Sequence, residues 1–431
     1  MIGSIMGTPP WSDSSEGSVA CLGQDIQGVG GHHSAERTGP NSGDQYLPIP
    51  PGYSQAPSRP AASAGWLPRR RGRDQIIGEE APNGTRERPF LSRVLRGNTR
   101  AIPLVSETLR GLQAFRTRAA RRRPCVEMQP AGQQFLERLQ SEVLVFDGAM
   151  GTMLFEAGLT DGACPELWNA ERPEVVQGIH RAYFAAGSDL VETNTFGGTR
   201  LKLRPYDLQD RVRELNVKGA WLARSVCPPG KFVAGSIGPT GHLPDTFEPL
   251  GDTPAEVFYE NFREQALALA EGGVDLFAIE TMMIPDEAVI AIQAAKEATG
   301  LPVMCSMFFQ WGRDKNIDRT MWGTTPGQAA RLLWEAGADV VGCNCGDGGP
   351  ARAAVIIREM RQAGTGFLVA YPNAGLPRIV NDRTVYELPP EEMPAAYPPI
   401  LDAGANIVGA CCGSTPEHIR RIAEVVRSRR R

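Results

Sequence analysis

Residues 338–346 read Ala-Asp-Val-Val-Gly-Cys-Asn-Cys-Gly, a short apolar run of β type that breaks into glycine. Residues 405–413 follow the same pattern and read Ala-Asn-Ile-Val-Gly-Ala-Cys-Cys-Gly. In both stretches the cysteines come where a strand is expected to give way to a loop. Enzymes built on parallel strands keep their catalytic residues at such strand ends. The two stretches therefore indicate a parallel sheet and the place of its functional site.

The cysteines of these stretches have the right number for a metal site. One thiolate from the first stretch and two from the second would give zinc three ligands and an open fourth position, as a catalytic zinc site requires. Two other interpretations remain open at this point. Free cysteines also pack as small apolar side chains, and Cys411 and Cys412 are neighbours that can form a strained disulfide.

Strand geometry helps to choose among these thiols. Cys343 and Cys345 are two positions apart and should face the same side of a regular strand. Cys345 lies nearer the end of the strand, so we expect it to be the ligand and Cys343 to pack in the core. Cys411 and Cys412 both reach one metal only if the backbone turns out of the strand, which the neighbouring glycines permit.

The chain beyond residue 128 alternates between strand-like and helical segments. The apolar strand-like runs are residues 143–146, 190–193, 232–236, 276–280, 303–307, 340–343, 367–371 and 407–410. The last helix has Thr415 as its expected N-cap and Pro416 as its first residue. Strands that alternate with helices imply parallel pairing. Eight such units in about 300 residues predict an α/β fold with a single (β/α)8 barrel of the TIM type.

A doubly wound open sheet is the alternative fold. That fold would place a G-x-G-x-x-G sequence after the first strand. The sequence there, at residues 147–152, is Asp-Gly-Ala-Met-Gly-Thr, which lacks the phosphate-binding glycine spacing. We therefore favour the closed barrel.

Polar residues stand at the carboxyl ends of the expected strands. They are Asp147, Glu192, Thr193, Asn194, Glu280, Asn344, Cys345, Asn373, Cys411 and Cys412. In a barrel these strand ends converge on one mouth, which predicts a polar pocket there. Any one of these residues alone is equally well explained as a helix cap or turn residue. Their joint occurrence supports a functional site.

Residues 1–127 have a different composition, rich in Gly, Pro, Ser and Arg, with 17 arginines and 11 acidic residues. Such a composition predicts a disordered extension ahead of a barrel domain at residues 128–431. The arginine runs also suit a tail for an anionic partner or an organellar transit peptide. Alternatively, translation starts at Met128, directly before the first expected element.

Bulk properties exclude several classes of protein. Residues 128–431 carry a formal charge of −10, which argues against nucleic acid as the main partner. The nine cysteines lack the regular spacing of a secreted disulfide framework, so we expect a reducing, cytoplasmic location. No apolar run approaches the ~20 residues that would span a membrane.

Four motifs together resemble those of the homocysteine S-methyltransferase family. They are residues 147–152, Glu-Thr-Asn-Thr-Phe at 192–196, Gly-Cys-Asn-Cys at 342–345 and Gly-Ala-Cys-Cys-Gly at 409–413. The chain is most similar to the homocysteine-binding barrel of cobalamin-dependent methionine synthase, over roughly residues 133–428. Residues 1–127 have no counterpart in that barrel.

The resemblance implies roles for particular residues. It implies zinc on Cys345, Cys411 and Cys412, with the homocysteine sulfur as the fourth ligand. It also implies that Asp147 and Glu280 hold the substrate ammonium. The backbone near Gly148 and Thr193 would then receive the substrate carboxylate.

The implied reaction is methyl transfer to the homocysteine thiol, which gives methionine. A free thiol has a pKa near ~8.5, and metal binding deprotonates it at neutral pH. The methyl group would come from a separate corrinoid protein or from a small molecule such as S-methylmethionine or betaine. The alternatives are a methyltransferase for another thiol or selenol, and a non-catalytic barrel that binds zinc or a partner.

Overall fold

The computed structural model describes residues 130–429 except 248, 313–316 and 381–382. The extension expected at residues 1–127 and the alternative start at Met128 lie outside the described residues. None of the described helices has both the length and the apolar character needed to cross a bilayer.

Eight parallel strands form one sheet, in the order β1-β12-β9-β8-β5-β4-β3-β2. The strands are β1 Leu144–Val145, β2 Leu190–Glu192, β3 Phe232–Ile237, β4 Leu276–Met282, β5 Val303–Met307, β8 Val340–Cys345, β9 Phe367–Pro372 and β12 Ile407–Val408. Asp189 links the two end strands, because its amide donates to Val145 O at 2.6 Å and its Oδ2 accepts from Val145 N at 2.9 Å. The predicted (β/α)8 barrel is confirmed.

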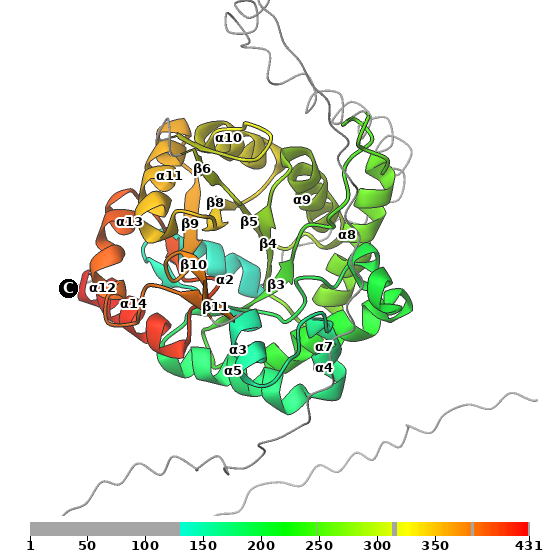
Figure 1. Cartoon of the computed structure of the whole chain (residues 1–431), viewed down its shortest axis with the longest axis horizontal. Coiled ribbons are helices and arrows are strands. Elements are labelled where there is room, and N and C mark those ends of the chain that lie inside the picture. Colours follow the sequence, from blue (N-terminus) through cyan, green and yellow to red (C-terminus); the bar gives the residue numbers. More distant parts are fainter. Residues whose placement is uncertain (1–129, 248, 313–316, 381–382, 430–431) are drawn as a thin grey trace, which may run out of the picture. The chain divides into compact units, whose positions relative to one another are not determined.

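The structure describes helices that surround the strands and one helix, α2, that lies near the centre of the ring in Figure 1. They are α2 Pro130–Leu139, α3 Met150–Glu156, α4 Trp168–Glu171, α5 Pro173–Ala186, α6 Arg200–Leu203, α7 Val212–Ser225, α8 Ala255–Glu271, α9 Pro285–Thr299, α10 Pro326–Ala336, α11 Gly349–Ala363, α12 Met393–Ala396, α13 Pro398–Asp402 and α14 Pro416–Arg429. Helix α14 begins at Pro416 as expected. The ring of His418 supports this start, because its Nδ1 accepts from Thr415 N at 3.1 Å.

The alternation of side chains along each strand separates two apolar cores. In β4, Leu276 and Ala278 belong to the core inside the barrel, whereas Phe277 and Ile279 pack between the strands and the helices. Phe135 of α2 joins the inner core and is fully buried. A barrel filled in this way is a solid scaffold, so its polar chemistry has to lie at the strand ends.

Two antiparallel hairpins interrupt the alternation, and sequence reasoning did not anticipate them. The first, β6 Gln310–Gly312 and β7 Ile317–Arg319, follows β5. The second, β10 Pro377–Val380 and β11 Arg383–Tyr386, follows β9. In Figure 1 the labels of β10 and β11 lie near the centre of the ring of helices. Both hairpins belong to loops at the carboxyl ends of strands, where the cysteines also lie.

Candidate active site

Three thiols come together at the carboxyl ends of β8 and β12. Sγ of Cys345 lies 2.9 Å from Sγ of Cys411 and 3.7 Å from Sγ of Cys412, and the latter two sulfurs are 3.8 Å apart. All three are free cysteines, so the disulfide between Cys411 and Cys412 is absent. Among the described residues, they are the one group of at least three His, Cys, Asp or Glu side chains arranged closely enough to share a metal ion.

Cys345 reaches this cluster by a route that simple alternation did not predict. Cys343 points away from the barrel interior and is buried in the outer core. Asn344 points inward, and Cys345 would point outward if the strand stayed regular. The backbone of Cys345 instead has a φ of 53°, which is unusual for a residue other than glycine. This left-handed turn brings its thiol into the mouth, so the argument that the two cysteines face the same side was wrong.

Cys411 and Cys412 lie beyond their strand, as the glycine argument required. Strand β12 ends at Val408, and Gly413 has a φ of 80°. Ser414 holds the loop, because its hydroxyl donates to Cys411 O at 2.7 Å and accepts from Ala149 N at 3.0 Å. The loop after β12 is thereby tied to the loop after β1.

The spacing of the sulfurs suits zinc. Ligands about 2.3 Å from a tetrahedral zinc lie about 3.8 Å from one another. Two of the three separations match this value, and the 2.9 Å contact has to lengthen on metal binding. Asn373, at the end of β9, has a buried Oδ1 without a hydrogen-bond partner among the described residues. Its Nδ2 donates to Gly346 O at 3.0 Å. The three sulfurs are a donor set that fits this ion.

The three thiols shift one another's pKa values. Hydrogen bonds from Cys345 and then from Cys411 lower the pKa of Cys412 to about 3. The pKa of Cys411 is raised, because its thiol is hydrogen-bonded to Cys345 and Cys412 and is buried. One thiolate is therefore stabilised by two neighbouring S–H groups. A divalent cation would take the place of the protons that these groups carry.

Three carboxyl groups occupy the same mouth, at the ends of β1, β2 and β4. They belong to Asp147, Glu192 and Glu280. Burial is the main cause that raises the pKa of each, and the pKa of Glu280 rises to about 7. Ser236 donates to Oε1 of Glu280 at 2.5 Å, and the nearby charge of Glu280 further raises the pKa of Glu192. Within the described residues, no ion pair with Lys or Arg neutralises these carboxyls. The cluster is thus suited to an ammonium group supplied by a ligand.

Glu192 is a site residue to which sequence reasoning gave no role. Its Oε2 is buried and has no hydrogen-bond partner among the described atoms. The signal was present in the sequence, because Glu192 follows the inward-facing Leu190 by two positions at the end of a strand. It was read only as part of a motif.

Thr193 and Gly148, the two residues expected near the substrate carboxylate, have different surroundings. The amide of Thr193 donates to Ala234 O at 2.9 Å, and its hydroxyl contacts Ser236 N and Thr195 Oγ1. The amide of Thr193 is therefore already used by the sheet. Gly148 is packed tightly, since an added Cβ would lie 2.6 Å from Oγ of Ser414.

A hydrogen-bond network connects the carboxyls with the thiols. Oδ1 of Asn344 accepts from Thr281 N at 2.8 Å and from Ser306 Oγ at 2.7 Å, and its Nδ2 donates to Thr281 Oγ1 at 2.7 Å. Thr281 directly follows Glu280 and has a φ of 57°. Asn344 directly precedes Cys345. The two halves of the site are thereby held at a fixed separation.

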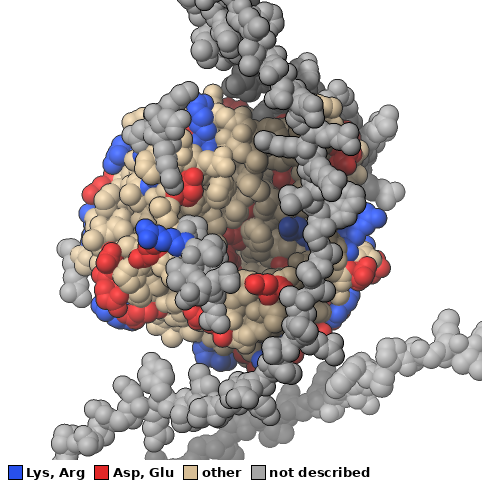
Figure 2. Space-filling view, viewed as in Figure 1, with Lys and Arg blue, Asp and Glu red and all other residues tan. Residues whose placement is uncertain are grey.

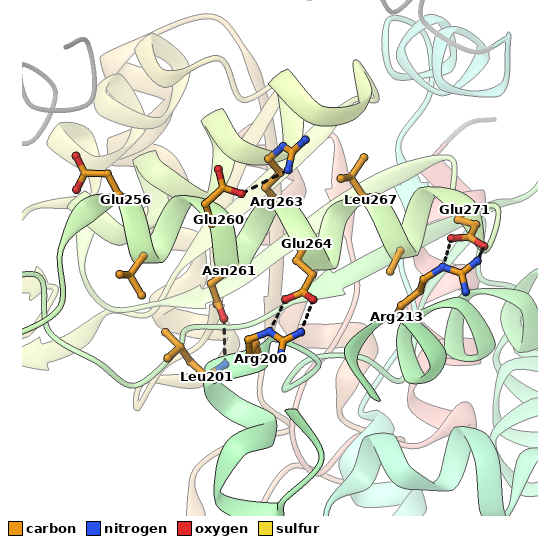
Figure 3. A pocket seen from close by; sticks show the side chains of 12 residues that line it. Arg200, Leu201, Arg213, Glu256, Glu260, Asn261, Arg263, Glu264, Leu267 and Glu271 are labelled. Atoms are coloured by element: carbon orange, nitrogen blue, oxygen red, sulfur yellow. Dashed lines mark hydrogen bonds and ion pairs between the residues drawn. The ribbon is translucent and has the colours of Figure 1, made fainter. Parts of the chain in front are cut away.

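A larger groove than any at the mouth lies elsewhere among the described residues. It has a volume of about 870 Å³ and runs along α8, on the outside of the barrel (Figure 3). Its charged side chains are largely paired with one another, for example Arg200 with Glu264 and Arg213 with Glu271. Figure 2 shows charged side chains mainly around the edge of the visible face, over the helices. The mouth of the barrel is assigned as the candidate site because it holds the thiol and carboxyl clusters, and not because of the volume of its cavity.

A parallel barrel with three thiols and three carboxyls at its mouth defines the class of (β/α)8-barrel proteins, which carry their functional sites at the carboxyl ends of the strands. More particularly, the chain belongs to the homocysteine S-methyltransferase family, whose model matches residues 144–426. The family recognised in the sequence is therefore confirmed.

Two methionine synthases are similar to this chain, one from Mycobacterium leprae (strain TN) and one from Mycobacterium tuberculosis (strain ATCC 25618 / H37Rv). Each is 36% identical over 310 residues, which cover 68% of this chain and 25% of the relative. The chain thus spans about a quarter of the length of these relatives. The metallated form of the homocysteine methyltransferase MmuM from Escherichia coli has the same fold, with a TM-score of 0.55 at 22% identity. That likeness covers 68% of this chain and 99% of MmuM.

Proposed function

We propose that the protein transfers a methyl group to the sulfur of homocysteine and forms methionine, with zinc bound by Cys345, Cys411 and Cys412. One observation carries the proposal: the thiol cluster and the carboxyl cluster share one mouth and are linked through Asn344 and Thr281. Homocysteine has a thiol at one end and an ammonium at the other. The two clusters match those two groups.

The thiol cluster lies where the thiol of homocysteine would bind and react. Bound zinc would lower the pKa of the substrate thiol, so that the sulfur is present as a thiolate at neutral pH. The three cysteines keep the site net negative, which leaves the substrate sulfur electron-rich. The sulfur lone pair forms the new bond to the methyl carbon, and the electrons of the broken bond leave with the donor. The protein contributes positioning and activation of the nucleophile.

The carboxyl cluster serves the other end of the substrate. Asp147 and Glu280 bind the ammonium by charge-assisted hydrogen bonds, and Glu192 lies beside them. An arriving ammonium supplies the positive charge that these buried carboxyls lack, so their ionised forms become favourable. The backbone at Gly148 faces the substrate carboxylate.

The methyl donor is a separate corrinoid protein or a small methylated molecule. Similarity to two methionine synthases, over a quarter of their length, supports the first source. Residues 1–127 would form an extension separate from the barrel at 128–431. The seven free cysteines of the described part support a reducing, cytoplasmic setting.

A direct assay tests the proposal. Zinc-loaded protein is incubated with homocysteine and, in turn, methylcobalamin on a corrinoid protein, S-methylmethionine or betaine, and methionine is measured by mass spectrometry. The Cys411→Ser variant is the inactive control, and Cys343→Ser is the matched control for loss of a thiol. Activity with another thiol but none with homocysteine would favour a different acceptor. Binding of zinc without any transfer would favour a non-catalytic barrel.

A further inference from the structure

Strand β4 has a β-bulge at the point where it reaches the mouth of the barrel. The pairing between β4 and β5 shifts there, so that Glu280 and Thr281 together lie opposite the single residue Ser306. Thr281 has a φ of 57°, which a β-branched residue rarely adopts. Bulges of this kind change the direction of side chains next to functional sites. The bulge therefore determines where the Glu280 carboxyl lies.

The buried side chain of Asn344, on β8, holds this bulge in place. Its Oδ1 accepts from Thr281 N at 2.8 Å, and its Nδ2 donates to Thr281 Oγ1 at 2.7 Å. Because β5 lies between β8 and β4 in the sheet, the Asn344 amide reaches across β5. Ser306 of β5 supports it, since its hydroxyl donates to Asn344 Oδ1 at 2.7 Å and its oxygen lies 2.6 Å from the hydroxyl of Tyr371. The left-handed threonine is thus fixed through two of its own polar atoms.

The same Asn344 side chain borders the thiols. Its Nδ2 lies 3.9 Å from Sγ of Cys411, and the next residue along the chain is Cys345, with its own left-handed φ of 53°. One left-handed residue therefore follows the carboxyl of Glu280, the other carries a thiol of the cluster, and Asn344 contacts or adjoins both. Strained backbone of this kind persists where the surrounding structure fixes it, and it is typical of functional sites. A single amide thus supports the carboxyl end and the thiol end of the mouth.

We infer that Asn344 and Thr281 are positioning residues that select the chain length of the amino thiol. The inference rests on the function proposed above, in which the substrate sulfur lies at the thiol cluster and the substrate ammonium at Glu280. When those two places are held at a fixed separation, only one length of chain reaches both. Cysteine, one methylene shorter than homocysteine, would reach one place and lose the other. The preference for homocysteine should then be roughly tenfold to a hundredfold, the contribution of one charge-assisted hydrogen bond.

Binding of three amino thiols that differ only in length tests the inference without turnover. They are cysteine, homocysteine and 2-amino-5-mercaptopentanoate, and their affinities for the zinc-loaded protein are measured by calorimetry. Thr281→Val replaces the acceptor Oγ1 by a methyl group and should reduce the preference for homocysteine by about three- to tenfold at unchanged zinc content. Ser306→Ala removes another partner of Asn344 and should act in the same direction. Thr299→Val is the matched control and should keep the wild-type preference, because its buried hydroxyl donates to Ala295 O at 2.9 Å at the end of α9, away from the mouth.

The outcomes separate this inference from the function on which it rests. If the zinc-loaded wild type bound none of the three thiols, the proposed function would be refuted, and the selection by length with it. If the wild type preferred homocysteine and both Thr281→Val and Ser306→Ala kept that preference, only the selection by length would be refuted. Equal weakening for all three thiols would also refute it, because the network would then support the fold without measuring the ligand. Equal affinity of the wild type for the three thiols would have the same meaning.

Discussion

The backbone amide of Glu192 donates to Oδ2 of Asp147 across 3.0 Å, which ties the end of β2 to the end of β1. This bond fixes Asp147 with one oxygen directed at the sheet. Burial raises the pKa of Glu192, whose side chain is also close enough to Glu280 for the charge of Glu280 to raise that pKa further. The mouth of the barrel therefore holds its carboxyls close together before any substrate arrives. Such a cluster is unfavourable in the empty protein and favourable around a cation.

The carboxyl cluster predicts the behaviour of Glu280→Gln. This variant should keep its zinc and bind homocysteine about ten- to a hundredfold more weakly, since a hydrogen bond to a charged group contributes roughly 1.5–3 kcal/mol. Binding of 3-mercaptopropionate, which has no amino group, should change little. Both affinities are measured by calorimetry on the zinc-loaded protein. Equal weakening for the two thiols would show that Glu280 acts on the metal or the fold.

The same carboxyl gives a pH dependence with a defined sign. The pKa of Glu280 is about 7, and only its ionised form attracts the ammonium. Preference for homocysteine over 3-mercaptopropionate should therefore fall as the pH drops from 8 to 6. The ratio of the two affinities is the quantity to measure, because deprotonation of the thiol affects both ligands alike. A ratio that does not vary with pH would place the ammonium elsewhere.

The thiol cluster predicts which cysteines hold the metal. Cys→Ser variants at Cys345, Cys411 and Cys412 should each lose the single zinc, because a hydroxyl is a much poorer ligand than a thiolate. Cys343→Ser should keep it, since Cys343 is buried in the outer core. Metal analysis of the four purified variants decides between these assignments. Loss of zinc from Cys343→Ser, with a native melting temperature, would contradict the assignment on β8.

His180, in α5, predicts sensitivity to acid. It is fully buried, neither ring nitrogen has a hydrogen-bond partner among the described residues, and burial lowers its pKa to about 3. The unfolded chain, with a pKa near ~6.5, takes up the proton first, so stability falls as the pH drops below that value. The loss is about 1.4 kcal/mol for one pH unit. His180→Leu should therefore gain stability relative to wild type between pH 7 and 5.5. The exposed His242→Leu should show no such gain in thermal melts.

The extension at residues 1–127 is expected to be dispensable for the barrel. Protein that starts at Met128 should have the same zinc content and melting temperature as the full chain. The reason is compositional, because this segment has too little apolar surface to offset the chain entropy lost on packing. Calorimetry and metal analysis of the two forms test this. A lower melting temperature of the shorter form would show that the segment packs on the barrel.

The sequence predicted most of the fold because its signals were local. For example, the run at residues 303–307 coincides with β5 Val303–Met307, and the other barrel strands agree within two residues at each end. The hairpins at β6–β7 and β10–β11 were missed because their strands are three or four residues long and carry no clear alternation.

The geometry of the site was harder to predict than its composition. Asp147, Glu280 and the three cysteines were found because they stand where apolar runs end. The left-handed turn at Cys345 was not predictable, because alternation describes only a regular strand. The use of the Thr193 amide by Ala234 was hidden as well, since it depends on the register between β2 and β3.

The left-handed backbone at Cys345 lowers the stability of the fold, while the proposed metal site requires a thiol at this position. A residue with a side chain costs roughly 1–2 kcal/mol more than glycine in this conformation. Glycine at residue 345 would therefore relieve the backbone while removing a thiol. Selection for a more stable barrel would favour glycine at residue 345, whereas selection for metal binding would retain cysteine. Variants selected for higher stability should accordingly be enriched in glycine at residue 345. Each variant that carries this glycine should fail to bind the metal.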